Sequence, residues 1–227
     1  MDRKEFKIND RDCVLYICGE PKALIVQPSM DFNETDEEVS ILSDRGYSFA
    51  LVSFKTRDWN RELSPWEAPP VFGKEGFGKG ADETLSFVLD SLIPEALKDL
   101  PSGLPIILCG YSLAGLFALY GAVKSDAFYG ACGVSPSVWF PGWLDYSMEN
   151  GFKSKAVYLS LGNKEAKTKN KVMAAVADCI EKEYEFIKEN GKMYCTFEWN
   201  EGNHFKDPQG RTAKGLAWCL DIVRKEE

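Results

Sequence analysis

A serine between small residues is the first feature of this sequence that could do chemistry. Gly110, Ser112 and Ala114 lie where the apolar run LPIILC meets the apolar segment LAGLFALYGAV. When a strand turns directly into a helix, the residues two before and two after the serine come close together, so both must be small. The spacing alone is weak because it arises by chance, but a strand before it and a helix after it favour Ser112 as a nucleophile.

The sequence contains a single histidine, His204, and it lies where a base for Ser112 is needed. A serine hydroxyl becomes a nucleophile when a base accepts its proton, and histidine titrates in the pH range that suits this task. His204 stands in WNEGNHFKDP, after the last predicted strand and before the last predicted helix. Gly202 and Asn203 indicate an irregular loop that can aim the ring, so His204 is the candidate general base.

A carboxylate that orients the histidine is expected at the end of the penultimate strand, and Glu165 in LSLGNKEAKTKN has that position. It would hold one tautomer of His204 and stabilise the imidazolium. Glu165 could instead be an ordinary charge at a helix start rich in Lys and Glu. Asp178 falls within a predicted helix, and Glu201 is close in the chain to His204. The expected site is a Ser–His–acid arrangement with Glu165, or else a Ser–His pair.

Two donors for a developing negative charge are also expected. Ser112 precedes a helix whose first N–H groups have no acceptor within the helix and lie at the positive end of its dipole. The N–H of Leu113 is therefore one expected oxyanion donor. The second is expected in the loop after an earlier strand, where ALIVQPSMD offers Ser29 or Met30.

Several aromatic side chains could line a substrate pocket next to these residues. A loop rich in Trp, Pro and Gly spans 58–80 and contains Trp59, Trp66 and Phe77, and Trp139 follows the segment SPS. Trp66 and Trp139 are candidates for substrate binding, with loop packing as the alternative. For Trp59 and Phe77 we expect packing.

The elements that must position these residues alternate between short apolar runs and helical patterns. Strands are predicted at 13–18, 23–27, 47–54, 106–109, 129–134, 156–161 and 194–199, and helices at 35–44, 81–97, 112–124, 170–189 and 208–223. Such alternation is typical of a mostly parallel central sheet with helices on both faces. We therefore expect a single α/β domain over 1–227, with 58–80 as a long ordered loop.

Composition limits the classes of molecule that the protein is expected to bind and the compartment in which it is expected. The 227 residues carry a formal net charge of −8, whereas nucleic-acid-binding proteins usually present a basic patch, so no nucleic-acid partner is expected. The first residues lack the apolar core of a secretion signal and no apolar run is long enough to span a membrane, so we expect a cytoplasmic protein. Seven cysteines without a CxxC pair indicate reduced thiols, and neither a metal ion nor an organic cofactor is expected.

Four blocks of the sequence resemble the esterase family that contains esterase D and the enterochelin-esterase-like hydrolases. They are FGKGADETLSFVLDSLIP, GYSLAGLFALY around Ser112, GVSPSVWF, and GNHF around His204, in that order over most of the chain. The resemblance implies an α/β-hydrolase fold and cleavage of a small-molecule ester through an acyl-enzyme. Ser112 and His204 match the family's nucleophile and base. Glu165 carries over less directly, because some relatives lack a clear acid.

Relatives in this family act on siderophore lactones, S-formylglutathione, or feruloyl and acetyl esters, and some transfer acyl groups. The residues quoted above do not select among these substrates. Two alternatives stay open, namely acyl transfer or thioester hydrolysis on the same residues, and a binding protein that retains the fold.

Overall fold

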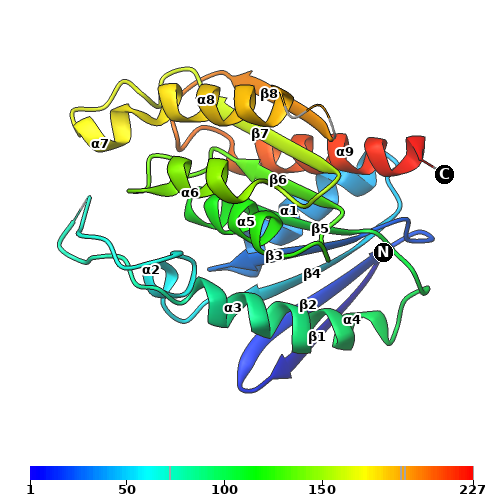
Figure 1. The fold of residues 1–227 in the computed structure, drawn as a ribbon. Helices are drawn as coiled ribbons and strands as arrows, with labels where there is room; N and C mark the ends of the chain where they lie inside the picture. The colour runs from blue at the N-terminus through cyan, green and yellow to red at the C-terminus, as the bar shows by residue number, and fades with distance from the viewer. Residues whose placement is uncertain (72, 190, 192, 227) are drawn as a thin grey trace.

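Eight strands form one sheet through the centre of the computed structural model (Figure 1). The structure describes residues 1–71, 73–189, 191 and 193–226. The strands are β1 (Asp2–Ile8), β2 (Arg11–Cys18), β3 (Leu24–Ser29), β4 (Phe49–Lys55), β5 (Ile106–Tyr111), β6 (Gly130–Val134), β7 (Ala156–Gly162) and β8 (Tyr194–Asn200). Their order is β1-β2-β4-β3-β5-β6-β7-β8. The pairs β1–β2 and β2–β4 are antiparallel and the others are parallel, which confirms a mostly parallel sheet.

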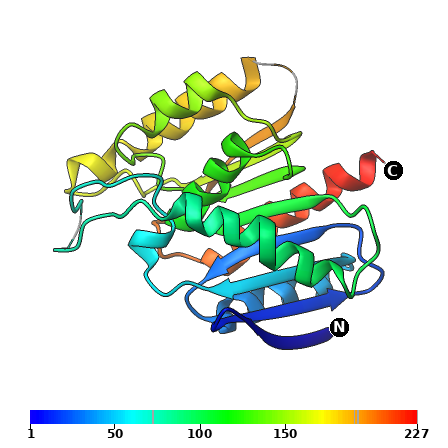
Figure 2. The same ribbon diagram turned by 60° about the horizontal axis from the view of Figure 1, so that its bottom comes forward.

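Helices cover both faces of this sheet, as predicted (Figures 1 and 2). They are α1 (Phe32–Asp44), α2 (Trp59–Glu62), α3 (Ala81–Phe87), η1 (Val88–Leu92), α4 (Ile93–Leu97), α5 (Leu113–Lys124), α6 (Trp143–Asn150), α7 (Lys171–Ala174), α8 (Val176–Glu189) and α9 (Pro208–Lys225). α1 and α9 pack together on one face over one hydrophobic cluster. α3, α4, α5, α6 and α8 cover the other face over a second cluster. The segments α3, η1 and α4 follow without a break, which confirms the helix predicted over 81–97.

The central strands are apolar on both faces because both faces are covered. In β3, Leu24 and Val26 belong to the cluster under α5, whereas Ile25 belongs to the cluster under α1 and α9. This alternation follows from the two-residue period of a strand. Because parallel strands end at the same edge of a sheet, the loops that follow β3, β5, β6 and β7 meet there.

The hairpin of β1 and β2 begins with a strand that the sequence analysis does not predict. The sequence of β1, DRKEFKI, is mostly charged and exposed, and it forms one edge of the sheet. Charged edge strands discourage pairing with other chains. The turn residues Asn9 and Asp10 have positive φ angles of 49° and 61°. Hairpin turns of this kind favour Asn, Asp and Gly, so the Asn-Asp pair is the local signal for this hairpin.

Other differences from the prediction lie near the carboxyl ends of the strands. The helix predicted over 170–189 is divided at Ala175 into α7 and α8. The unpredicted α6 has eight residues, too few for helical periodicity to stand out. The loop predicted at 58–80 contains α2 and a bridge between Ala68 and Phe77, and its residue 72 lies outside the described residues.

Two expectations from composition concern the whole chain. All seven cysteines are free thiols, and five of them are buried. Among the described residues, no helix combines the length and the apolar character that a membrane crossing requires.

The turn from β5 into α5 is tightly constrained. Ser112 occupies it with φ 61° and ψ −121°, a conformation that residues other than glycine rarely adopt. A Cβ atom at Gly110 would lie 2.3 Å from the carbonyl carbon and oxygen of Ala114. The missing side chain at Gly110 therefore lets α5 begin directly after the strand, as the small-residue spacing predicts.

Gly110→Ala is expected to lower the free energy of unfolding by more than about 3 kcal/mol, because the new methyl group collides with backbone rather than with a movable side chain. Gly130→Ala is the matched control, since a Cβ atom at Gly130 has its nearest neighbour at 3.6 Å, an ordinary contact. Urea unfolding followed by circular dichroism measures both variants. Equal stability of the two would show that the turn can relax.

Candidate active site

Ser112, His204 and Glu165 lie in one hydrogen-bonded line at the carboxyl edge of the sheet. Ser112 follows β5, Glu165 follows β7, and His204 lies between β8 and α9. His204 Nε2 is 3.0 Å from Ser112 Oγ, and His204 Nδ1 is 2.7 Å from Glu165 Oε2. When Nδ1–H donates to the carboxylate, Nε2 keeps a lone pair that can accept the serine proton.

The Glu165 carboxylate is buried, with its side chain 5% exposed, and both of its oxygen atoms accept hydrogen bonds. Oε1 accepts from the Ser135 hydroxyl at 2.8 Å and from the Gly162 N–H at 2.7 Å, while Oε2 faces His204. Burial by itself raises the pKa of Glu165, but the hydrogen bonds from His204, Ser135 and Gly162 outweigh it and hold the pKa below its ordinary value. The carboxylate is therefore ionised throughout the neutral pH range.

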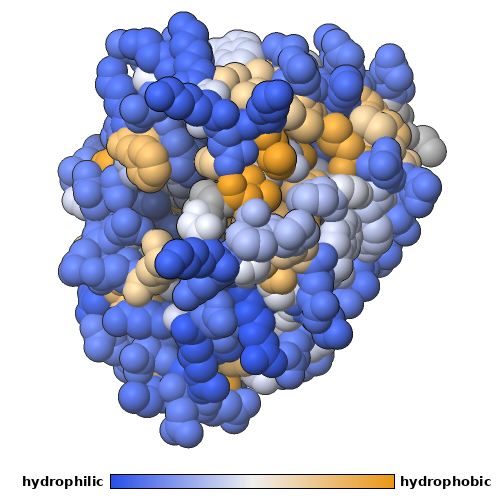
Figure 3. Space-filling model, turned by 90° about the vertical axis from the view of Figure 1, so that its left-hand side faces the viewer, coloured by the Kyte–Doolittle hydropathy of each residue, from blue (hydrophilic) through white to orange (hydrophobic). Residues whose placement is uncertain are grey.

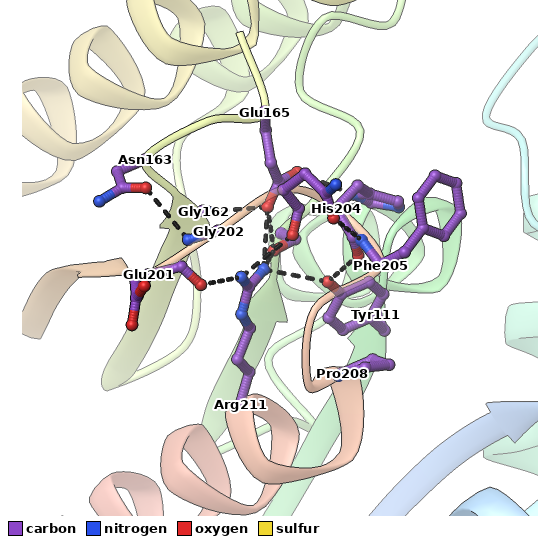
Figure 4. Close-up of polar contacts among 12 residues, drawn as sticks. Tyr111, Gly162, Asn163, Glu165, Glu201, Gly202, His204, Phe205, Pro208 and Arg211 are labelled. Atoms are coloured by element: carbon purple, nitrogen blue, oxygen red, sulfur yellow. Dashed lines mark hydrogen bonds and ion pairs between the residues drawn. The ribbon is translucent and has the colours of Figure 1, made fainter. Parts of the chain in front are cut away.

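Arg211 is a site residue that the sequence analysis misses (Figure 4). It stands in the first turn of α9 and its side chain is 3% exposed. Nη1 lies 3.1 Å from Glu165 Oε1, and Nη2 donates to the carbonyl oxygens of Glu201 at 2.9 Å and Asn203 at 3.1 Å. One guanidinium thus connects the acid to the loop that carries His204. The sequence signal for its burial is that Arg211, although charged, falls at the helical spacing of the apolar residues that α9 buries.

The backbone of the His204 loop is fixed at two further points, which Figure 4 also shows. The Tyr111 hydroxyl donates to the His204 carbonyl oxygen at 2.5 Å. The Gly202 N–H donates to Asn163 Oδ1 at 3.0 Å. Gly202 has a φ angle of 105°, which favours glycine, and a Cβ atom there would lie 2.5 Å from the Lys206 side chain. The loop therefore holds the histidine ring through contacts with β5 and with the loop after β7.

Leu113, Ser29 and Met30, the residues predicted around the oxyanion, lie beside Ser112. Leu113 is the first residue of α5, so its N–H has no acceptor within the helix. Ser29 ends β3, which is paired with β5, and both Ser29 and Met30 line a pocket that also contains Ser112. The Ser29 hydroxyl already donates to the Asp31 carbonyl oxygen at 2.8 Å.

Two pockets with different linings open on the Ser112 side chain. The first, of 280 Å³, lies between the end of β3, α1 and the start of α9; we call it the polar pocket. Its lining includes Gln27, Glu34, Glu38, Trp59 and Gln209, beside Ser112 and His204.

The second pocket, of 380 Å³, also reaches Ser112 and His204, and we call it the apolar pocket. Its lining includes Trp139, Met173, Val176 and Phe205. Phe205 is 85% exposed and borders both pockets. Figure 3 shows the face at which the parallel strands end, where hydrophobic side chains gather near the middle of a mostly hydrophilic surface. A substrate at Ser112 thus meets a mixed polar and apolar lining on one side and a mainly apolar lining on the other.

Of the four aromatic residues considered from the sequence, two line a pocket next to Ser112 and two do not. Trp139 lines the apolar pocket, and Trp59 lines the polar pocket, so the expectation that Trp59 only packs is incomplete. Trp66 is not among the residues that line either pocket; its Nε1–H donates to the Pro141 carbonyl oxygen at 2.8 Å. Phe77 is 6% exposed and packs edge-on against Trp139, as expected.

The other acids considered from the sequence lie elsewhere. The Glu201 carboxylate is exposed and lies 3.2 Å from Lys206 Nζ, and Asp178 is exposed on α8. Glu165 is thus the carboxylate that meets His204. In the part of the chain that the structure describes, no group of three or more His, Cys, Asp or Glu side chains could hold a metal ion.

Arg211→Met is expected to lower the free energy of unfolding by about 3–5 kcal/mol, because it leaves the buried Glu165 carboxylate without its cation. Lys214→Met is the control on the same helix; it removes an ion pair with Glu198 in which the lysine side chain is 49% exposed, and should change stability by less than about 1 kcal/mol. Urea unfolding at neutral pH measures both. Equal losses would contradict the role of Arg211 as the buried counter-ion.

No family model and no curated protein matches the sequence. Solved structures do match. An IroE-like serine hydrolase from Shewanella oneidensis has a TM-score of 0.80 and 16% identity, over 97% of this chain and 80% of that one. The siderophore hydrolase EstA from Aspergillus nidulans has a TM-score of 0.72 and 16% identity, over 97% of this chain and 94% of that one. The enterobactin esterase FES from Shigella flexneri has a TM-score of 0.72 and 17% identity, over all of this chain and 60% of that one. At these identities the similarity lies in the arrangement of the elements, and the chain has the α/β-hydrolase fold.

Proposed function

We propose that this chain is a serine esterase in which Ser112 attacks the carbonyl carbon of a small-molecule ester. The observation that carries the proposal is the hydrogen-bonded line from Ser112 Oγ through His204 to the buried Glu165 carboxylate. Acyl transfer to a serine requires these groups in this geometry. Similar solved structures include a siderophore hydrolase and an enterobactin esterase, which supports an ester as the substrate.

The reaction divides into two half-reactions. Ser112 Oγ forms a bond to the carbonyl carbon while its proton passes to His204 Nε2, and the carbonyl π electrons move onto the oxygen. The intermediate then expels the alcohol, which takes the proton from His204, and leaves an acyl-enzyme. Water attacks the acyl carbon with His204 as base, and collapse of the second intermediate releases the acid and restores Ser112. The ionised Glu165 stabilises the imidazolium in both halves and takes no proton itself.

The oxyanion of each intermediate would lie between two N–H donors. Leu113 N–H, at the start of α5, is one of them. Because the Ser29 hydroxyl already donates to Asp31, we assign the second donor to a backbone N–H, that of Ser29 or Met30. Donors fixed in this way stabilise the developing charge without reorganisation during the reaction.

Ser112→Ala is expected to lower the hydrolysis of p-nitrophenyl butanoate by at least about 10³-fold, because no other group takes the place of the nucleophile. His204→Ala should have a similar effect, since the sequence has no second histidine. Release of p-nitrophenol measures the rate, and circular dichroism verifies that the variants are folded.

A fluorophosphonate probe provides an independent readout, since it should label wild-type Ser112 and leave Ser112→Ala unlabelled. Full esterase activity in folded Ser112→Ala would contradict the assignment of Ser112 as the nucleophile. A wild-type protein that neither hydrolyses esters nor reacts with the probe would favour a binding protein that retains the fold.

Glu165→Gln is expected to lower kcat by about 10²–10⁴-fold with little change in KM, because the neutral amide cannot stabilise the imidazolium. Asp178→Asn is the control, since it removes an exposed carboxylate from α8 and should leave kcat unchanged. The same chromogenic assay separates kcat from KM. A wild-type kcat in Glu165→Gln would favour a Ser–His pair that works without an acid.

A further inference from the structure

The Tyr111 hydroxyl makes two contacts at the site that the reaction mechanism does not use. Tyr111 is the last residue of β5 and directly precedes Ser112. Figure 4 shows its hydroxyl between Arg211 and the His204 loop, 3.3 Å from Arg211 Nη1 and 2.5 Å from the His204 carbonyl oxygen. A guanidinium only donates hydrogen bonds, so the hydroxyl accepts from Arg211 and donates its own proton to the carbonyl oxygen.

Tyr111 remains a hydrogen-bond donor at neutral pH. Its side chain is half-buried, and burial raises the pKa of the hydroxyl above its ordinary value. The hydroxyl therefore keeps its proton throughout the neutral pH range. The contact with Arg211 directs that proton toward the His204 loop, because the guanidinium takes an acceptor site on the other side of the oxygen.

The contact from Tyr111 joins the two segments whose separation decides whether Ser112 can lose its proton. Ser112 lies in the turn after β5, whereas His204 lies in the loop between β8 and α9. The distance of 3.0 Å between Ser112 Oγ and His204 Nε2 therefore depends on how this loop lies against β5. A displacement of about 1 Å between reacting groups can lower a rate about 100-fold. Tyr111 connects the backbone of the base to the strand that carries the nucleophile.

The other hydrogen bonds of the His204 loop attach it to different elements. Three backbone groups that precede His204 are held by the side chains of Arg211 and Asn163, which belong to α9 and to the loop after β7. The contact at His204 itself goes to β5. The Tyr111 ring also lies beside the imidazole, with the ring centres 5.1 Å apart and the planes at 52°. Tyr111 thus adjoins both the backbone and the ring of the base.

We propose that Tyr111 is a positioning residue for acyl transfer: its hydroxyl attaches the His204 backbone to β5 and thereby keeps Nε2 within hydrogen-bonding distance of Ser112 Oγ. The inference rests on the proposed esterase function and adds a residue that neither attacks the ester nor takes its proton. Tyr111 also lines the polar pocket, so a contact with the substrate is the competing role. A positioning residue changes kcat by the same factor for different esters, whereas a substrate contact changes KM.

Tyr111→Phe removes the hydroxyl and keeps the ring. We expect kcat to fall about tenfold or more, by the same factor for p-nitrophenyl acetate and p-nitrophenyl butanoate, with KM within about twofold of the wild-type value. Tyr47→Phe is the matched control, because Tyr47 is also half-buried, its hydroxyl donates to Asp221 Oδ2 at 3.1 Å, and it is not among the residues that line either pocket. It should lose a similar amount of stability and keep the wild-type kcat. Thermal melting verifies that both variants are folded.

A second measurement observes the base directly, because His204 is the only histidine in the sequence. NMR of protein with a ¹⁵N-labelled imidazole therefore gives one set of ring signals. In the wild type under mildly alkaline conditions we expect a proton on Nδ1, shielded from exchange with water by the Glu165 carboxylate, and none on Nε2. The Nδ1–H signal should broaden or disappear in Tyr111→Phe and persist in Tyr47→Phe. A loss of stability alone does not change this signal in a protein that is still folded.

A variant with p-aminophenylalanine at position 111 tests whether the hydrogen-bond donor is the property that matters. Its amino group can donate to the His204 carbonyl oxygen in place of the hydroxyl. We expect it to restore kcat to within about threefold of the wild-type value and to restore the Nδ1–H signal. Should Tyr111→Phe fail to fold, this variant decides, since a wild-type kcat supports the proposal and a low kcat in folded protein overturns it.

Each result supports or overturns the positioning role. A fall in kcat confined to Tyr111→Phe, with KM retained and the Nδ1–H signal lost, supports it. An unchanged kcat, an equal fall in Tyr47→Phe, a change in KM alone, or a fall in kcat with an unchanged Nδ1–H signal overturns it. If Ser112→Ala abolishes an activity that Tyr111→Phe retains in full, the esterase proposal stands and only the positioning role fails. If the wild type hydrolyses no ester and a fluorophosphonate leaves Ser112 unlabelled, both proposals fail.

Discussion

Glu165 places a negative charge where the ends of β6 and β7 meet the first turn of α9, and the geometry of the site depends on how that charge is stabilised. Its side chain is 5% exposed, and an unpaired ion at such a depth is strongly destabilising. Arg211, Ser135 and Gly162 supply donors from three separate segments. The contacts that stabilise the carboxylate thereby hold these segments together, and Arg211 extends the same network to the His204 loop.

The nucleophile depends on a second constraint, which is local strain offset by packing. The positive φ angle of Ser112 is unfavourable, but its N–H donates to the Val134 carbonyl oxygen and its own carbonyl oxygen accepts from the Ser137 N–H, both at 3.0 Å. Residues Leu113 through Val123 of α5 are all buried. Strained backbone of this kind persists where the surrounding structure determines it from several sides. A serine held this way projects its hydroxyl to the edge where the two pockets meet.

The two pockets have a simple origin in the layers of the fold. The polar pocket lies beside α1 and α9. The apolar pocket lies beside Trp139 and residues of α7 and α8. Polar side chains at the strand end, such as Gln27, can stay buried because a partner on the covering helix satisfies half of the amide. The fold thus presents a substrate at Ser112 with chemically different surroundings on its two sides.

The sequence by itself determined the parts of the protein that depend on short-range geometry. Gly110, Ser112 and Ala114 predict the turn between β5 and α5, because backbone sterics act over a few residues, and the alternating apolar runs predict the parallel sheet. A single histidine left one candidate for the base. The charged strand β1 could not be predicted in this way, because an exposed edge strand needs no apolar pattern.

Only the tertiary structure decided which side chains from distant segments meet. It brought Glu165 rather than Asp178 or Glu201 to His204, buried Arg211 beside that carboxylate, and placed Trp59 but not Trp66 among the pocket-lining residues. The paths of the loops after β4, β7 and β8 depend on packing between residues far apart in the chain. A local pattern of residue types does not indicate which of these distant residues come into contact.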